Sequence, residues 1–290
     1  MDKLASAEQA LSVIESGMTV GIGGWGPRRK PMSLIRGLLR SDVTDLTLVA
    51  YGGADVGLLC AAGKVKRVIF AFVSLDFMPL EPAFRQARES GSIDVTELDE
   101  GMLLLGLRAA AWGLPFIPTS VGLGTDVIRN APAIKVIESP YDDKEWVAMP
   151  ALPLDVALVH ATRADDSGVC EISSPDHYMD DWFVRAANHS IVSVDEFVEK
   201  RYFANPEVAR RVYWERNCTQ AVVHQPGGAH PTSSDPLYGF DVRHFKHYGE
   251  LIAEGGYASW AERYLGLNES SYQDAVGGLE AIQSLALPVY

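Results

Sequence analysis

Val20-Gly21-Ile22-Gly23-Gly24-Trp25-Gly26-Pro27-Arg28-Arg29-Lys30-Pro31 joins an apolar run, a cluster of glycines and three consecutive cations. Residues 32–40 follow with apolar side chains at helical spacing, so this region predicts a strand, a glycine turn and a helix. Cations beside the positive end of a helix are unfavourable by about 0.3 to 1 kcal/mol each unless an anion lies among them. Glycines also let backbone N–H groups approach a phosphate or an oxyanion closely. The turn therefore indicates an anionic ligand, although a tight turn with a solvated basic patch explains the same residues.

The spacing of these glycines argues against two common nucleotide sites. It is neither GxGxxG followed by an acidic residue about 20 positions later nor GxxxxGK[ST]. We therefore do not expect an ordinary dinucleotide or nucleoside triphosphate site at this turn.

Short β-branched runs alternate with helical patterns along much of the chain. This alternation predicts an α/β fold with a mostly parallel open sheet and helices on both faces, as in Rossmann-like proteins. Residues 103–112 give the clearest helix, and residues 131–143 are the most loop-like internal stretch. We expect a single domain over residues 1–290, with an irregular segment from about residue 226. The predicted strands span residues 18–22, 46–50, 65–73, 93–97, 156–160, 191–194 and 221–223.

The composition limits the classes of partner. A net charge of −13 and a pI near 4.9 disfavour nucleic acid and anionic membrane surfaces, so the local cations suggest a small-ligand site. The three cysteines form no CxxC pair, no charged and apolar signal segment precedes Ala5, and no apolar run approaches membrane-spanning length. We therefore expect a cytoplasmic protein. His244 and His247 lie three residues apart without a HExxH frame, so we expect no metal site.

Acidic residues gather where the strand at residues 93–97 turns into a helix, and this carboxyl edge of a parallel sheet is where catalytic groups collect. Asp99 is a good helix N-cap, and acids in a first helical turn also suit the helix dipole, so a structural role is a strong alternative. If one acid is catalytic, we favour Glu100, because Gly101 beside it permits close substrate approach. A general base works best with its pKa raised by burial, which Met102, Leu103 and a substrate tail would supply.

Other nucleophiles have weaker sequence support. Cys170, Ser173 and Ser174 lie outside any frame such as GxSxG, so a covalent serine or cysteine hydrolase is not indicated. His160 ends an apolar strand and is more consistent with a hydrogen-bonded structural histidine than with a site residue, although a site role stays open.

Several short motifs are spread over nearly the whole chain. They are Gly23-Gly24-Trp25-Gly26-Pro27 with residues 28–31, Tyr51-Gly52-Gly53, Glu100-Gly101-Met102, Gly122-Leu123-Gly124-Thr125, Ala164-Asp165-Asp166-Ser167-Gly168 and Pro226-Gly227-Gly228-Ala229-His230-Pro231. Together these segments resemble the α subunit of family I coenzyme A transferases. Within that superfamily, Phe72-Val73-Ser74-Leu75-Asp76 and Asp99-Glu100-Gly101-Met102 are similar to the α subunit of the steroid ring-opening hydrolases.

The resemblance implies a heteromer with a homologous β subunit, as a heterodimer or an α2β2 heterotetramer. Its substrate would be a cyclic β-keto acyl-CoA thioester from the C and D rings of a steroid such as cholesterol, opened by hydrolysis of a C–C bond. Coenzyme A is then part of the substrate, and no metal or redox cofactor is required. Glu100 is the catalytic carboxylate carried over from the family. The expected substrate-binding and CoA-binding residues are Gly23, Gly24, Trp25, Gly26, Arg28, Arg29, Lys30 and Gly101, with N–H groups near Gly23, Gly24 and Gly101 as oxyanion donors.

Two alternatives remain open. True transferases of the 3-oxoacid or glutaconate type use a glutamate nucleophile in a Glu-Asn-Gly or similar frame on the β subunit. This chain contains no Glu-Asn-Gly, but an α subunit would lack it in either case. The second alternative is a noncatalytic CoA-binding subunit.

Overall fold

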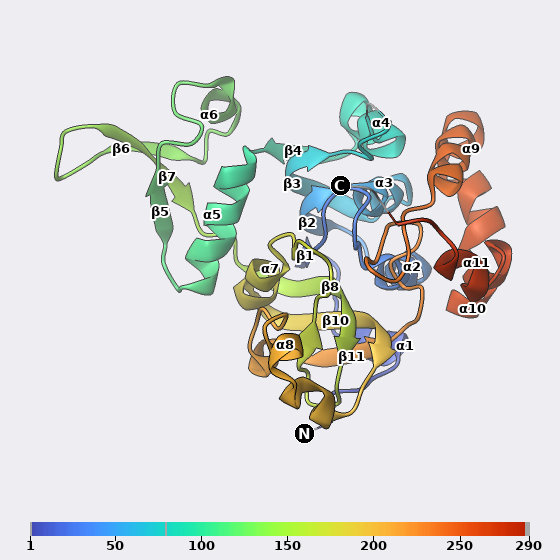
Figure 1. The fold of residues 1–290 in the computed structure, drawn as a ribbon. Coiled ribbons are helices and arrows are strands. Elements are labelled where there is room, and N and C mark those ends of the chain that lie inside the picture. Colours follow the sequence, from blue (N-terminus) through green and yellow to red (C-terminus); the bar gives the residue numbers. More distant parts are fainter. Residues whose placement is uncertain (1, 79, 288–290) are drawn as a thin grey trace.

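The main sheet is built from parallel strands in the order β11-β10-β8-β1-β2-β3-β4, with the short β9 paired antiparallel to β8. This sheet is part of the protein as seen in a computed structural model, which describes residues 2–78 and 80–287 (Figure 1). The fold class predicted from the sequence is therefore confirmed. Its strands are β1 (Thr19–Ile22), β2 (Leu46–Gly52), β3 (Val65–Val73), β4 (Asp94–Glu97), β8 (Leu154–Ala164), β9 (Cys170–Glu171), β10 (Ala187–Phe197) and β11 (Ala221–His224).

The strand order reverses at β1, which lies between β2 and β8. The chain first builds the sheet outward from β1 to β4 and later outward from β8 to β11 on the other side. In open α/β sheets, ligands bind beyond the carboxyl ends of strands at such a reversal. The glycine turn that follows β1 therefore lies at the expected position for a site.

Helices cover both faces of the main sheet, with α2 to α4 on one side and α5 and α7 on the other (Figure 1). Each face has its own apolar core, which is why strands such as β8 are buried along almost their whole length. The helices up to residue 218 are α1 (Ala7–Leu11), α2 (Met32–Arg40), α3 (Ala54–Ala61), α4 (Pro82–Ser90), α5 (Glu100–Ala111), α6 (Asp126–Asn130), α7 (Asp180–Ala186), η1 (Lys200–Ala204), α8 (Pro206–Ala209) and η2 (Arg216–Cys218).

A small antiparallel sheet follows α5 and projects from the main body (Figure 1). It consists of β5 (Phe116–Thr119), β7 (Glu145–Pro150) and β6 (Lys135–Glu138), in that spatial order. The expectation of a loop over residues 131–143 was thus wrong for β6. That strand lies at an edge and is mostly exposed, so its residues carry no burial pattern that would reveal a strand.

The C-terminal part of the chain also differs from the expectation. Residues 226–241 contain no named helix or strand, but helices follow from Val242, so an irregular segment running on from residue 226 was wrong beyond Asp241. Phe245, Tyr248 and Tyr272 of this part belong to the same core as α2 to α4, which explains why the segment folds. Its elements are α9 (Val242–Trp260), η3 (Ala261–Leu265), α10 (Glu269–Ala275) and α11 (Leu279–Gln283).

Within the described ranges 2–78 and 80–287, none of the helices combines the length and apolar character needed to cross a membrane.

Candidate active site

The glycine turn after β1 is a tight turn closed by backbone hydrogen bonds. Trp25 and Arg28 exchange backbone hydrogen bonds of 2.9 Å in both directions. Gly24 has a φ of +75°, and a Cβ there would lie 2.5 Å from the carbonyl oxygen of Arg29. A side chain at Gly24 would therefore clash with the backbone that directs the three cations.

Two of the three cations point into the protein. The Arg29 side chain lies 3.0 Å from Asp180, and the Lys30 ammonium lies 3.1 Å from Asp55, with all four side chains at most 1% exposed. The expectation that Arg29 and Lys30 face a ligand is therefore not met. The anions that resolve the conflict between these cations and the helix start are carboxylates of the same chain.

Burial shifts the pKa values of Asp180 and Lys30, one from each buried pair. Burial raises the pKa of Asp180 to about 6, and the neighbouring Arg29 opposes that shift. Burial lowers the pKa of Lys30, and Asp55 opposes that shift in turn. Desolvation disfavours both charged forms, so each ion depends on its partner.

A second glycine loop covers the start of α2. The N–H of Arg29 donates to the Ser233 carbonyl over 2.7 Å, and the N–H of Ser33 donates to the Gly228 carbonyl over 2.8 Å. The N–H of Lys30 donates to the Thr232 hydroxyl over 3.0 Å. These bonds satisfy N–H groups that would otherwise be free to bind an anion. Groups of the same chain therefore accept hydrogen bonds from the backbone just before α2 and from Ser33 in its first turn.

The three proposed oxyanion donors are also engaged. Gly23 donates its N–H to Leu158 over 2.9 Å, and Gly24 donates to the Asp180 carboxylate over 2.7 Å. Gly101 donates to the Asp99 carboxylate over 2.8 Å. The expectation that these three N–H groups serve an oxyanion therefore does not fit this arrangement.

Trp25 and Arg28 face outward instead. Both line a pocket of about 640 Å³ together with Asp76 and Tyr178. Arg28 forms an ion pair of 2.5 Å with Asp76, and their side chains are 23% and 42% exposed. A pocket of this volume, with an aromatic wall and a few charged groups, has the character of a small-molecule site.

Glu100 begins α5 and its side chain is exposed. Asp99 caps the helix, as expected, so the Glu100 carboxylate is not needed for capping. Partial burial raises the pKa of Glu100, and the charge of Asp99 raises it further. Met102 and Leu103 are fully buried in the core beneath α5, so the predicted shielding of Glu100 by these two side chains is not found.

Tyr51 connects the pocket wall to the helix that carries Glu100. Its ring stacks on Trp25 with centroids 4.8 Å apart. Its hydroxyl donates to the backbone carbonyl of Glu100 over 2.8 Å. Trp25 and Glu100 are thus linked through a single buried tyrosine at the carboxyl edge of the sheet.

Three residues of this region, Asp55, Asp180 and Tyr51, were not predicted as site residues from the sequence. A signal existed for Asp55, because it is the only charged residue between Tyr51 and Lys64 and lies among apolar residues. A lone carboxylate in such a segment indicates a buried cationic partner. Asp180 and Tyr51 offered no comparable signal, since their contacts join segments far apart in sequence.

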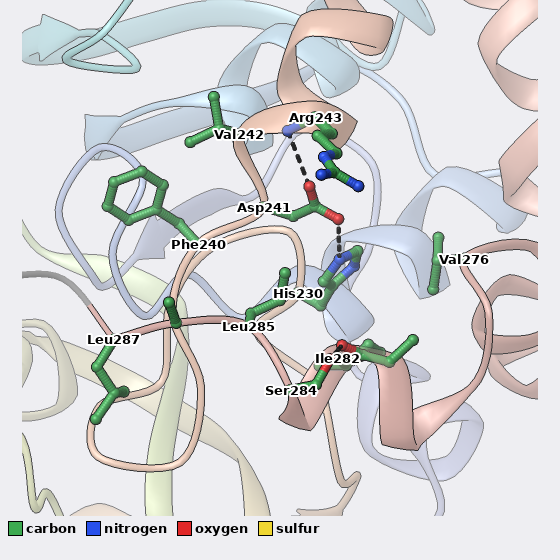
Figure 2. Close-up of a pocket in the computed structure, with 12 residues that line it drawn as sticks. His230, Phe240, Asp241, Val242, Arg243, Val276, Ile282, Ser284, Leu285 and Leu287 are labelled. Atoms are coloured by element: carbon green, nitrogen blue, oxygen red, sulfur yellow. Dashed lines mark hydrogen bonds and ion pairs between the residues drawn. The ribbon is translucent and has the colours of Figure 1, made fainter.

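Two other features lie apart from these residues. His160 is fully buried between Ser193 and Asp195, with 2.8 Å to each, which supports its structural interpretation. A further pocket of about 670 Å³ lies beside the start of α9, where Asp241 contacts His230 (Figure 2). None of the residues that line this pocket was predicted as a site residue. Among the described residues, no group of three or more His, Cys, Asp or Glu side chains is arranged to hold a metal.

The fold and the turn define a protein of the coenzyme A transferase type. The coenzyme A transferase family matches residues 4–225, so the chain belongs to that family. It is 44% identical over 283 residues to the cholesterol ring-cleaving hydrolase IpdA subunit of Mycobacterium tuberculosis, an alignment that covers 95% of this chain and 97% of that protein.

Two solved structures extend the likeness. Glutaconate coenzyme A-transferase from Acidaminococcus fermentans superposes with a TM-score of 0.91 at 24% identity, covering 99% of this chain and 96% of that chain, which shows the shared fold. A variant of the decarboxylase AibA/AibB gives a TM-score of 0.81 at 30% identity, covering 90% of this chain and 98% of that chain.

Proposed function

We propose that this chain is the α subunit of a heteromeric hydrolase that opens the ring of a cyclic β-keto acyl-CoA thioester during steroid breakdown, as in cholesterol C and D ring degradation. The observation that carries the proposal is Glu100. Its carboxylate is free of the capping role, it lies at the carboxyl edge of the sheet, and its pKa is raised above the ordinary value for glutamate. The 44% identity to a cholesterol ring-cleaving hydrolase subunit supplies the reaction class.

In the proposed reaction, Glu100 takes a proton from water and the water oxygen bonds to the ring ketone carbon. The bond between that carbon and the α-carbon of the thioester then breaks, and its electron pair forms the thioester enolate. The proton held by Glu100 returns to the α-carbon. One water is consumed, the former ketone carbon becomes a carboxylic acid that ionises by releasing its proton to solvent, and the CoA thioester is retained.

The oxyanion that forms on the ketone needs hydrogen-bond donors. Because the N–H groups of Gly23, Gly24 and Gly101 already have partners, we assign these donors to residues outside this set. The homologous β subunit is the proposed source. It is also the proposed source of apolar cover for Glu100, whose side chain is exposed in this chain.

We assign the CoA part of the substrate to the pocket at Trp25 and Arg28. Arg28 is the cation of the turn that is available to a phosphate or a substrate carboxylate, since Arg29 and Lys30 are paired inside the protein. In this proposal coenzyme A belongs to the substrate, and water addition requires no metal or redox cofactor.

The proposed assembly is a heterodimer or an α2β2 heterotetramer in the cytoplasm. Relatives and a structural neighbour are themselves subunits or two-component proteins. Cys60, Cys170 and Cys218 are free thiols in the described residues, which suits a reducing compartment.

The test is Glu100→Gln in the reconstituted heteromer, with Glu97→Gln as the matched control. Glu97 lies three residues earlier and forms a surface ion pair with Arg88. We expect Glu100→Gln to lower turnover of a cyclic β-keto CoA thioester by about 10²- to 10⁴-fold, because a general base is lost, while substrate still binds. Glu97→Gln should stay near the parent rate. Undiminished turnover with Gln at position 100 would remove Glu100 from the mechanism and favour a noncatalytic α subunit.

A further inference from the structure

We infer that Tyr51 is a positioning residue for Glu100, and this inference rests on the proposed function. Tyr51 is the second-last residue of β2, and its side chain is completely buried. Its hydroxyl reaches across to α5 and donates to the backbone carbonyl of Glu100 over 2.8 Å. The contact therefore ties the central sheet directly to the residue that carries the proposed base.

The contact acts where a helix is least constrained. The first turn of a helix frays because its N–H groups have no partners within the helix. In α5 that turn is fixed by Asp99, which accepts from Gly101, and by Tyr51, which holds the carbonyl of Glu100. The direction of the Glu100 side chain depends on this backbone, so the hydroxyl of Tyr51 sets where the carboxylate lies.

Tyr51 is itself held rigidly by aromatic neighbours. Trp25 stacks on one side at 4.8 Å with an interplanar angle of 21°, and Phe183 meets the ring edge-on at 6.3 Å. Trp25 also lines the pocket assigned to the substrate. The pocket wall and the general base therefore share one support, which fixes their separation before substrate arrives.

The role of Tyr51 is mechanical rather than chemical. Its side chain is buried, and its hydroxyl donates to a backbone carbonyl. Burial raises the pKa of Tyr51 well above its ordinary value, so the phenol keeps its proton at all physiological pH values and remains a donor. Tyr51 therefore acts as a hydrogen-bond donor to the backbone and not as an acid or base.

The experiment uses Tyr51→Phe in the assembled heteromer. This change removes one oxygen and keeps the ring between Trp25 and Phe183. We expect kcat to fall by about 10- to 100-fold with KM changed less than about twofold, because the base is displaced while the binding pocket is kept. Tyr272→Phe is the matched control, since Tyr272 is equally buried and its hydroxyl bonds His230 in the C-terminal part of the chain. It should leave kcat unchanged.

Two further measurements separate positioning from a general structural effect. In the Glu100→Gln background, Tyr51→Phe should cause no additional loss, because both changes act through the same carboxylate. Replacing Tyr51 by 4-aminophenylalanine, which restores an N–H donor, should recover most of the parent kcat. If Tyr51→Phe assembles poorly, the 4-aminophenylalanine variant tests on its own whether a donor at this position supports kcat.

The outcomes are distinguishable. A parent-like kcat for Tyr51→Phe, or an equal further loss in the Glu100→Gln background, would overturn the positioning role of Tyr51 while leaving the proposed function intact. Full turnover by Glu100→Gln alone would instead overturn the proposed function.

Discussion

The inner and outer cations of the glycine turn are adjacent in sequence and opposite in environment. Arg29 and Lys30 are buried against Asp180 and Asp55, whereas Arg28 lies at a pocket mouth with the half-exposed Asp76. The inner pairs hold the turn and the start of α2, whereas the outer cation is the one that the proposed function assigns to the substrate. A basic run beside glycines therefore does not act as one surface patch, because backbone direction divides it into a buried part and an exposed part.

The largest effect should come from breaking an inner pair. Asp55→Asn removes the charge beside Lys30 but keeps an oxygen that can accept from the N–H of Gly53. We expect the free energy of unfolding to fall by about 3 to 5 kcal/mol, because an uncompensated buried ammonium remains. Chemical denaturation of the purified chain or heteromer measures this change.

Two controls belong to that experiment. Asp76→Asn breaks the outer pair and should cost less than about 1 kcal/mol, since exposed ion pairs contribute little. Adding Lys30→Met to Asp55→Asn should restore most of the lost stability. Equal stability losses for Asp55→Asn and Asp76→Asn would contradict the division into inner and outer cations.

A smaller effect should follow from the outer cation. Arg28→Ala should raise the KM for a CoA thioester by about tenfold, the loss of one charge-assisted hydrogen bond, with kcat and unfolding temperature nearly unchanged. Steady-state kinetics on the heteromer gives both constants. Arg28→Lys should restore only part of the affinity if the contact is bidentate. An unchanged KM for Arg28→Ala would show that the outer cation does not touch the substrate.

The smallest effect concerns pH. A general base must be deprotonated, so kcat falls as the pH drops through the Glu100 pKa, and the raised pKa moves this loss above the ordinary range for glutamate. Asp99→Asn keeps a capping oxygen and removes the neighbouring charge, which should shift the acid limb to lower pH by less than about one unit. The pH profile of kcat measures it, with the exposed Asp94→Asn as control. A shift to higher pH would contradict the assigned electrostatics.

Local periodicity predicted much of the fold because neighbouring residues carry that information. The helix predicted from residue 32 to residue 40 and the strand over residues 65–73 have the observed bounds. The edge strand β6 was missed because its exposed residues show no alternation. The helices after Asp241 were missed because glycine, proline and histidine in residues 226–241 suggested that the irregularity continues.

The candidate site was only partly predictable. The capping role of Asp99 follows from its position before a helical run, and the structure has it. The inward direction of Arg29 and Lys30 was hidden, because their partners Asp180 and Asp55 lie 151 and 25 positions away in sequence. Tyr51 was overlooked because its hydroxyl bonds a backbone carbonyl 49 positions later in the sequence. That carbonyl is on α5, which follows β3 and β4 along the chain.

The most direct test of the account is the fate of water oxygen. The reconstituted heteromer is incubated with a cyclic β-keto CoA thioester in water labelled with oxygen-18, and the product is analysed by mass spectrometry. We predict one labelled oxygen in the newly formed carboxylate, an intact CoA thioester, and loss of labelling in Glu100→Gln. Transfer of CoA to a second acid with an unopened ring, through a glutamyl thioester trapped by hydroxylamine on the β subunit, would contradict the account.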